Sequence, residues 1–264
     1  MAISDKLIVV DTLTEDVLRK LFRREHIVVR VPKFYNPEYC AALAEGVMAD
    51  IVDTAGSGIY ASNIDSLWAA RRSEDRHRRY FETGIVIQRR LRQVSAPHVS
   101  PTDLLRLTLD EAWPGGTALM CRNGLKAPFG ISRLWRVGSE GLPHQDLLKR
   151  ELGDDKLDEL KISDQIGVNI YLTTSSAGGE LETWDFVVSD DEYEEIAQRF
   201  EGSYGYPREM LPRESLVVAP EVGDLIMVNT ACVHAIRKIV DGERLTISGF
   251  VGCAGEDRHL LCWS

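Results

Sequence analysis

The sequence predicts a mixed α+β protein in which a mainly helical N-terminal part precedes a β-rich core. Apolar residues recur at helical spacing before about residue 130, and short β-branched segments separated by turns follow it. The 264 residues are 44% hydrophobic and 27% charged, which is ordinary for a globular chain with a sizeable core. We therefore expect one domain over 1–264, divided into a helical part at 1–130 and a core at 131–264.

Capping and turn residues mark the N-terminal elements. Thr14 is a good N-cap for a helix, and Asn36-Pro37 places proline in the first turn of the next one. Between them, a β-branched run stops at Pro32, which is typical of a strand. An arginine-rich, partly apolar segment covers 71–92. The expected elements are helices over 14–23, 36–51 and 101–112 and a strand over 26–31.

The second half of the chain alternates short strands with turns. Gly178-Gly179, Val222-Gly223 and Asp241-Gly242 are typical turn dipeptides. Strands at this spacing favour an antiparallel barrel or sandwich. Two acidic insertions, near 147–162 and 190–201, have helical character. The expected strands cover 131–137, 165–173, 180–188, 215–219, 224–229, 234–240 and 244–251.

Charge and cysteine content narrow the functional class. The formal charge is −10, which argues against binding a nucleic-acid polymer or an anionic membrane surface. The N-terminus lacks the pattern of a signal peptide, and no segment approaches the roughly 18 apolar residues that span a bilayer. The five cysteines form no CxxC pair, which fits a reducing compartment. We therefore expect a cytoplasmic protein that binds neither a nucleic-acid polymer nor a membrane.

His144-Gln145-Asp146 is the first candidate for chemistry. In an extended segment, residues i and i+2 point to the same side, so His144 and Asp146 can present an imidazole and a carboxylate to one point. His234 begins a later strand and is a candidate third ligand. Two histidines and a carboxylate form the facial triad of non-haem Fe(II) oxygenases. By itself, however, an HxD triplet also arises by chance.

The residues around this triplet add to the metal interpretation. Arg244 follows His234 by ten residues, and its guanidinium could pair bidentately with a carboxylate inside a barrel. The sequence AGGEL at 177–181 predicts a tight connection between strands, and PEVGDLIM at 220–227 predicts a turn and a buried strand before His234. Each feature alone has an ordinary structural explanation, whereas their order together favours an iron site.

In this order the motifs resemble those of the 2-oxoglutarate/Fe(II) dioxygenase superfamily over residues 130–252. Within it, the chain is most similar to the carrier-independent aliphatic halogenases of the welwitindolinone type and their hydroxylase relatives. The shared features are AGGEL, PEVGD at 220–224, the strand RLTISGF at 244–250 and the final Trp263-Ser264. The resemblance implies a double-stranded β-helix, or jelly-roll, core.

The resemblance also implies roles for particular residues. His144, Asp146 and His234 match the iron ligands, and Arg244 matches the arginine that binds the co-substrate 2-oxoglutarate. The halogenases have Gly or Ala where Asp146 stands, and that vacancy admits chloride. A carboxylate here implies oxygenation with Fe(II), 2-oxoglutarate and O2, most simply hydroxylation of an unactivated C–H bond of an amino acid, natural-product intermediate or nucleotide.

Further residues are candidates for the two binding pockets. Thr246 and Trp135 could line the co-substrate pocket, and Trp184 could wall the substrate pocket, although core packing would also explain each of them. Arg71 and Arg72 begin a cluster that could hold a substrate carboxylate or phosphate, or could simply be a solvated helix face. The cluster comprises Arg71, Arg72, Arg76, Arg78 and Arg79.

Other functions fit the same motifs. Desaturation, cyclisation and epimerisation use the same cofactors and differ from hydroxylation only in how the substrate is placed. A cupin-like metal-binding barrel without 2-oxoglutarate is a different class, and Arg244 argues against it because such a barrel needs no carboxylate clamp.

Overall fold

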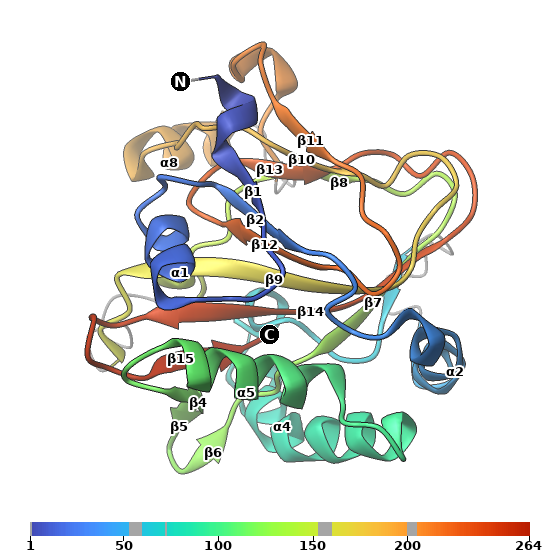
Figure 1. Cartoon of the computed structure of the whole chain (residues 1–264). Helices are drawn as coiled ribbons and strands as arrows, with labels where there is room; N and C mark the ends of the chain where they lie inside the picture. The colour runs from blue at the N-terminus through green and yellow to red at the C-terminus, as the bar shows by residue number, and fades with distance from the viewer. Residues whose placement is uncertain (1, 53–59, 72, 153–159, 200–204) are drawn as a thin grey trace.

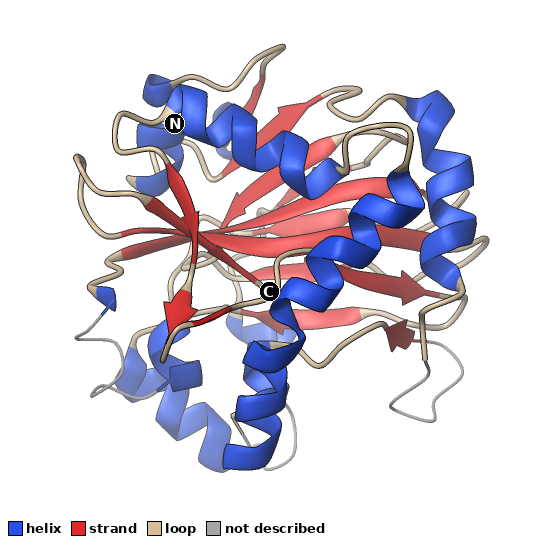
Figure 2. Ribbon diagram, turned by 90° about the horizontal axis from the view of Figure 1, so that it is seen from below, coloured by secondary structure: helices blue, strands red, loops and turns tan. Residues whose placement is uncertain are grey.

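The computed structural model describes residues 2–52, 60–71, 73–152 and 160–199, together with 205–264 (Figure 1). Two β-sheets face one another, and helices cover the outer side of the larger sheet (Figures 1 and 2). This is the layered arrangement of a jelly roll with added helices. The expected mixed class with a β core is therefore confirmed.

The larger sheet is built around two long strands, β9 (Asp164–Thr173) and β14 (Arg244–Cys253), which pair antiparallel along their whole lengths. β7 and β15 share the other edge of β14, and β3 pairs with β7. The remaining strands continue the sheet on either side, in the order β1-β2-β12-β9-β14-β15-β4. Their bounds are β1 Leu7–Val9, β2 Val28–Val31, β3 Tyr60–Ser62, β4 Thr117–Leu119, β7 Ile131–Trp135, β12 Leu225–Asn229 and β15 Leu260–Trp263.

The smaller sheet has the order β11-β10-β13-β8, and all of its pairs are antiparallel. Its strands are β8 Gly141–His144, β10 Leu181–Thr183, β11 Leu216–Val218 and β13 His234–Ile236. A separate hairpin joins β5 (Cys121–Arg122) to β6 (Leu125–Lys126).

Sequence signals explain where the main helices begin. Thr14 and Ser73 accept backbone N–H bonds as the N-caps of α1 and α4, and proline occupies the first turn of α2 and α5. The helices are α1 Glu15–Phe22, α2 Pro37–Met48, α3 Leu67–Ala70, α4 Glu74–Ser95, α5 Pro101–Ala112, α6 Leu148–Leu152 and α8 Asp190–Arg199, with 3-10 turns at Ile3–Lys6 and Arg208–Met210. No helix in the described part of the chain is long and apolar enough to cross a membrane.

Side-chain alternation on β9 separates the core from the interior of the roll. Ile166, Val168 and Ile170 point outward into the apolar core that the sheet forms with α1, α2, α4 and α5. Asn169 and Tyr171 point the other way, toward the smaller sheet. Burial of the first set fixes the register of the strand, because a shift by one residue would exchange its two faces. This places polar groups between the sheets.

The predicted boundaries were most accurate where capping or proline residues set them. The helices α1, α2 and α5 and the strand β2 are confirmed. The strand expected over 180–188 ends at Thr183, and the one over 234–240 ends at Ile236. The N-terminal part also contributes four strands to the larger sheet, of which only β2 was expected. Three-residue strands such as β1 and β3 are too short to produce a periodic pattern.

The glycine turn before β10 provides a test of the packing between strands. Gly178 has φ +77°, and an added Cβ would overlap the carbonyl oxygen of Lys238. Gly124, in the β5–β6 turn, has φ +76° with open space around it. We expect Gly178→Ala to lose about 1–3 kcal/mol more stability than Gly124→Ala, because only the first adds a clash to the shared backbone strain. Chemical denaturation of both variants measures the difference, and equal losses would contradict it.

Candidate metal centre

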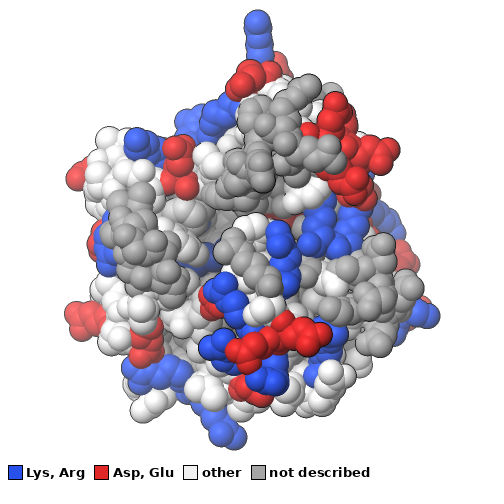
Figure 3. Space-filling model, turned by 180° about the vertical axis from the view of Figure 1, so that it is seen from behind, with Lys and Arg blue, Asp and Glu red and all other residues white. Residues whose placement is uncertain are grey.

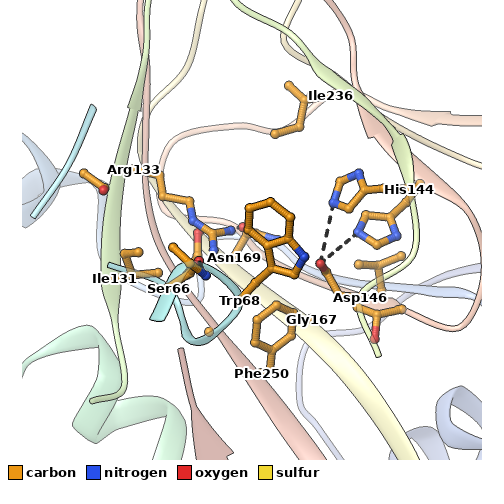
Figure 4. A pocket seen from close by; sticks show the side chains of 18 of the residues that line it. Ser66, Trp68, Ile131, Arg133, His144, Asp146, Gly167, Asn169, Ile236 and Phe250 are labelled. Atoms are coloured by element: carbon orange, nitrogen blue, oxygen red, sulfur yellow. Dashed lines mark hydrogen bonds and ion pairs between the residues drawn. The ribbon is translucent and has the colours of Figure 1, made fainter. Parts of the chain in front are cut away.

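Three side chains that can ligate a metal converge between the sheets. One ligand atom from each of His144, Asp146 and His234 lies within 4.8 Å of the others. The Oδ2 atom of Asp146 is 3.6 Å from Nε2 of His144 and 3.4 Å from Nε2 of His234. Figure 4 shows the His144 imidazole directed at the Asp146 carboxylate. Two imidazoles and one carboxylate on one side of a cavity form the donor set of a facial triad.

Strand pairing explains this convergence. β8 and β13 are neighbours in the smaller sheet, and His144 stands directly opposite His234. Residues that pair in this way lie on the same face of the sheet. Asp146 follows His144 by two residues, and its N–H donates to Thr230 O at 3.2 Å. The local i, i+2 spacing and the nonlocal strand pairing together assemble the three ligands.

Backbone hydrogen bonds orient both imidazoles. His144 Nδ1 is 2.6 Å from Leu142 O, and His234 Nδ1 is 3.1 Å from Cys232 O. A carbonyl oxygen only accepts, so Nδ1 carries a hydrogen in each ring, and Nε2 is the nitrogen left to ligate a metal that takes the place of its proton. Metal-binding histidines typically have their second nitrogen held in this way.

The electrostatics of the cluster favour an ionised carboxylate. Burial acts to raise the pKa of Asp146, but the charge and hydrogen bonds of His144 and His234 outweigh burial and hold that pKa well below its usual value. Burial acts to lower the pKa of His144, whereas the Asp146 carboxylate more than offsets it, so the pKa is raised. Because the anion is shared between two imidazoles, a divalent cation can take the place of a proton here.

The cluster opens into a cavity of about 600 Å³ between the two sheets. Arg244 lines the opposite wall and is 2% exposed. Its Nη2 donates to Tyr171 Oη at 3.2 Å, while its buried Nε has no hydrogen-bond partner. Among the described residues, no carboxylate pairs with this cation. A buried guanidinium without an anion is costly, so the cavity is suited to an anionic guest at Arg244.

The other predicted co-substrate residues have different surroundings. Trp135 pairs with Arg244 across β7 and β14 and lines the cavity, with its ring centroid 6.0 Å from the Arg244 Cζ atom. Its buried indole Nε1 has no partner. Thr246 is fully buried and its hydroxyl is 3.0 Å from Ser248 Oγ. Ser248, rather than Thr246, is among the residues that line the cavity.

Two of the predicted substrate residues do not line the cavity. Trp184 is 3% exposed and packs with Val188, Ile196 and Val233 behind the smaller sheet. Thr183 pairs with His234, which faces the cavity, so the next side chain after β10, that of Trp184, points to the other face of the sheet. Arg71 stacks on Trp68, with its Cζ 4.6 Å from the ring. Arg72 lies outside the described residues.

Within the predicted arginine cluster, Arg76 is the described member that lines the cavity, and it pairs with Asp65 at 2.9 Å. Arg78 and Arg79 are largely exposed and pair with Asp75 on their own helix. Basic and acidic side chains are likewise interspersed on the face seen in Figure 3. On α4, Arg76 therefore faces the cavity, whereas Arg78 and Arg79 face solvent.

Several cavity residues were not anticipated. Arg133, Asn169 and Trp68 project into the cavity (Figure 4). Arg133 Nε is buried without a partner, and its charge opposes protonation of His144. The signal for Arg133 was present, since it stands two residues before Trp135 and shares its strand face. Trp68 had no such signal, because α3 is a four-residue helix whose place depends on a bond from Leu67 N–H to Ser264 O.

Comparisons with known proteins agree with this geometry. The family "Carrier-protein-independent halogenase WelO5" matches residues 148–264, a range that includes His234 and Arg244 and begins after Asp146. An L-isoleucine 3(1)-dioxygenase from Pantoea ananatis is 27% identical over 125 residues, covering 47% of this chain and 42% of that protein. The chain thus matches less than half the length of this relative.

Solved structures share the fold. An N-substituted L-amino acid dioxygenase from Burkholderia ambifaria matches with TM-score 0.66 and 16% identity, covering 95% of this chain and 91% of its own. HygX from Streptomyces hygroscopicus, solved with nickel and 2-oxoglutarate, matches with TM-score 0.51 and 17% identity, covering 91% and 87%. The chain therefore has the jelly-roll fold of these proteins, and it resembles the 2-oxoglutarate/Fe(II) dioxygenase superfamily and its WelO5-type halogenases.

Removal of one imidazole tests the metal centre. We expect His234→Ala to weaken Mn²⁺ binding by at least tenfold, because two remaining ligands cannot hold the ion. His98→Ala is the matched control, since His98 stacks on Tyr39 at a ring distance of 3.5 Å and is not part of the cluster. Electron paramagnetic resonance of free Mn²⁺ gives both dissociation constants. Parental affinity in His234→Ala would contradict the assignment of His234 as a ligand.

Proposed function

We propose that this protein is an Fe(II)- and 2-oxoglutarate-dependent oxygenase that hydroxylates a C–H bond of a small molecule. One observation carries the proposal: the His144–Asp146–His234 cluster shares its cavity with the buried Arg244, which pairs with no carboxylate among the described residues. A metal site alone would suit many functions. A metal site that shares its cavity with an unneutralised guanidinium is suited to an oxygenase whose co-substrate is a dicarboxylate.

The donor set fits Fe(II). Imidazole nitrogens and carboxylate oxygens both suit this ion, and three protein ligands on one side leave room for exchangeable ones. His144 and His234 would each supply Nε2, and Asp146 would supply a carboxylate oxygen. When bound, iron together with 2-oxoglutarate and O2 supplies the oxidising power that breaks an unactivated C–H bond. The protein's own contribution is to hold, orient and enclose the reactants.

The surroundings of Arg244 fit 2-oxoglutarate. A carboxylate paired with this guanidinium would satisfy its orphaned Nε and neutralise its buried charge. The Tyr171 hydroxyl already holds Nη2, so the guanidinium is oriented before a ligand arrives. Its aromatic neighbours Tyr171 and Trp135, at 5.0 and 6.0 Å from Cζ, limit the water that reaches the pair. A second carboxylate at the far end of the same molecule can extend toward the metal centre.

Asp146 favours hydroxylation over halogenation. The halogenases that this chain resembles lack a carboxylate at that position, which leaves room for chloride. Here the carboxylate is present, and its low pKa keeps it ionised at neutral pH. The anion occupies the place that a halide would need, and it also repels one.

The charges of the cavity suggest a zwitterionic substrate such as an amino acid. Arg133 supplies positive charge and Glu140 supplies negative charge on the same lining, where Arg76 and Asp65 pair with each other. The carboxylate of an amino acid could pair with the positive side chain and its ammonium group with the negative one. Its own side chain would then extend toward the metal cluster. The name of the L-isoleucine 3(1)-dioxygenase relative is consistent with this class.

A substrate screen tests the proposed reaction. The protein, loaded with Fe(II) under oxygen, would be incubated with 2-oxoglutarate and panels of amino acids, nucleotides and alkaloid precursors. We expect succinate to form fastest with an amino acid and the product to gain one oxygen atom. Mass spectrometry would also detect loss of two hydrogens, which would indicate desaturation. Metal binding without substrate-triggered succinate formation would contradict an oxygenase and favour a non-catalytic barrel.

Arg244 should control the affinity for 2-oxoglutarate. We expect Arg244→Gln to raise the KM for 2-oxoglutarate by one to two decades, since a charge-assisted hydrogen bond contributes roughly 1.5–3 kcal/mol. Arg237→Gln is the matched control, because Arg237 lies nearby in sequence and already pairs with Glu182. Steady-state kinetics at saturating substrate would give both constants. A larger effect for Arg237 would place the clamp there instead.

Asp146 should decide the reaction class. We expect Asp146→Gly to lose most hydroxylation and to give at best partial chlorination, because productive chlorination also depends on where the substrate lies. The wild type should oxygenate even in high chloride. Product mass spectra of both proteins, with and without chloride, provide the test. A chlorinated product from the wild type, or full hydroxylation by Asp146→Gly, would show that Asp146 is not a ligand.

A further inference from the structure

Gln145, the residue between His144 and Asp146, has a fully engaged side chain. It is 9% exposed, and its Nε2 donates to Ala231 O at 2.6 Å. Its Oε1 accepts from Tyr206 Oη at 2.6 Å and from Arg150 Nη1 at 3.1 Å. A side chain in the middle of an HxD triplet needs no such network for folding into a strand. Its bonds instead lead to the segment that carries the third ligand.

The Gln145–Ala231 bond joins the two ligand-bearing segments beyond the end of their strand pairing. The β8–β13 ladder reaches the pair His144–His234 and stops there. Past it, Asp146 N–H donates to Thr230 O at 3.2 Å, and Gln145 donates to Ala231 O. These two bonds set the separation between Asp146 and the turn that leads into His234. The first is a longer backbone bond, and the second is short and made by a side chain.

The acceptor side of Gln145 is held by Arg150, in the first helical insertion, and by Tyr206, which follows α8 in the chain. Arg150, on α6, has an 11% exposed side chain and pairs through Nη2 with Asp190 of α8 at 3.1 Å. Its guanidinium also lies 3.9 Å from the ring centroid of Tyr193 on α8. Tyr206 is bonded to β8 through its N–H, which donates to Pro143 O at 2.6 Å. Arg150 and Tyr206 thus orient the Gln145 carboxamide from outside the cluster. In this orientation its NH2 group points at the carbonyl oxygen of Ala231.

We propose that Gln145 is a positioning residue that fixes the distance between Asp146 and His234, with Tyr206 and Arg150 orienting its carboxamide. This inference rests on the proposed function, because the distance matters only if the cluster binds a metal. Gln145 does not touch the reacting atoms. It acts through the backbone of the turn at Ala231, so its loss should change metal affinity while leaving the Arg244 side of the cavity intact.

Three variants remove different hydrogen bonds of the Gln145 network. Gln145→Leu removes both sets of bonds. Gln145→Glu keeps an acceptor for Tyr206 and Arg150 but loses the donor to Ala231 O. Tyr206→Phe keeps the Ala231 bond and loses one of the two donors that orient it. Loss of a group that supports a metal ligand typically costs 10–100-fold in metal affinity. We expect this loss for both Gln145 variants and a smaller one for Tyr206→Phe.

Gln88→Leu is the matched control for a purely structural effect. Gln88 is 2% exposed, and its Nε2 donates to the Phe129 carbonyl at 2.7 Å, which is the same kind of bond away from the cluster. Both Leu variants should lower the melting temperature of the metal-free protein. Only Gln145→Leu should raise the dissociation constant for Mn²⁺, measured by electron paramagnetic resonance of the free ion.

The outcomes separate this inference from the proposed function. A parent protein that binds no Mn²⁺ would overturn both. A parent that binds Mn²⁺, with parental affinity in Gln145→Leu and Gln145→Glu, would overturn the positioning role alone. An equal loss of affinity in Gln88→Leu would also overturn it, since the effect would then follow from general destabilisation. If Gln145→Leu does not fold, Gln145→Glu and Tyr206→Phe decide the question by the same titration.

Discussion

Two short antiparallel strands, β8 and β13, pair so that His144 stands opposite His234, and the rest of the site depends on this register. A shift by one residue would turn one imidazole to the other face of the sheet. The neighbouring pairs β10–β13 and β10–β11 hold β13 in place, and the apolar cluster around Trp184 packs behind it. The smaller sheet therefore fixes the positions of the two candidate histidine ligands, His144 and His234.

The larger sheet supplies the opposite wall, and its chemistry follows from side-chain alternation. Its outer face is apolar and is covered by α1, α2, α4 and α5, whereas its inner face carries Arg244, Ser248 and Asn169. The long pairing of β9 with β14 makes this wall rigid. Arg244 is buried in this wall, and no carboxylate pairs with it in the part of the chain that the structure describes. The unneutralised charge is then available to a ligand.

The helical insertions α6 and α8 are joined to the metal cluster at the edge of the cavity. Arg150 is bonded to Gln145 on one side and to Asp190 on the other, so the cluster and α8 are parts of one polar network. Such a network restricts the arrangement of the groups within it, although the buried Nε of Arg150 has no hydrogen-bond partner among the described residues. In this protein the network occupies the rim, where β8 gives way to irregular structure.

The sequence by itself determined the class of the fold and the capped helices α1, α2 and α5. It also placed His144 and Asp146 on the same side of an extended segment. These features depend on spacing over a few residues. The tertiary structure alone decided which of the described arginines in 71–79 faces the cavity, that Trp184 packs in the core, and that Trp68 enters the cavity. Such choices depend on contacts between segments far apart in the chain, as when Ser264 holds the short helix of Trp68 in place. No local sequence pattern encodes these placements. An arginine or tryptophan side chain fits equally well on either face of its own helix or strand, and the segment that packs against that element decides which face it takes.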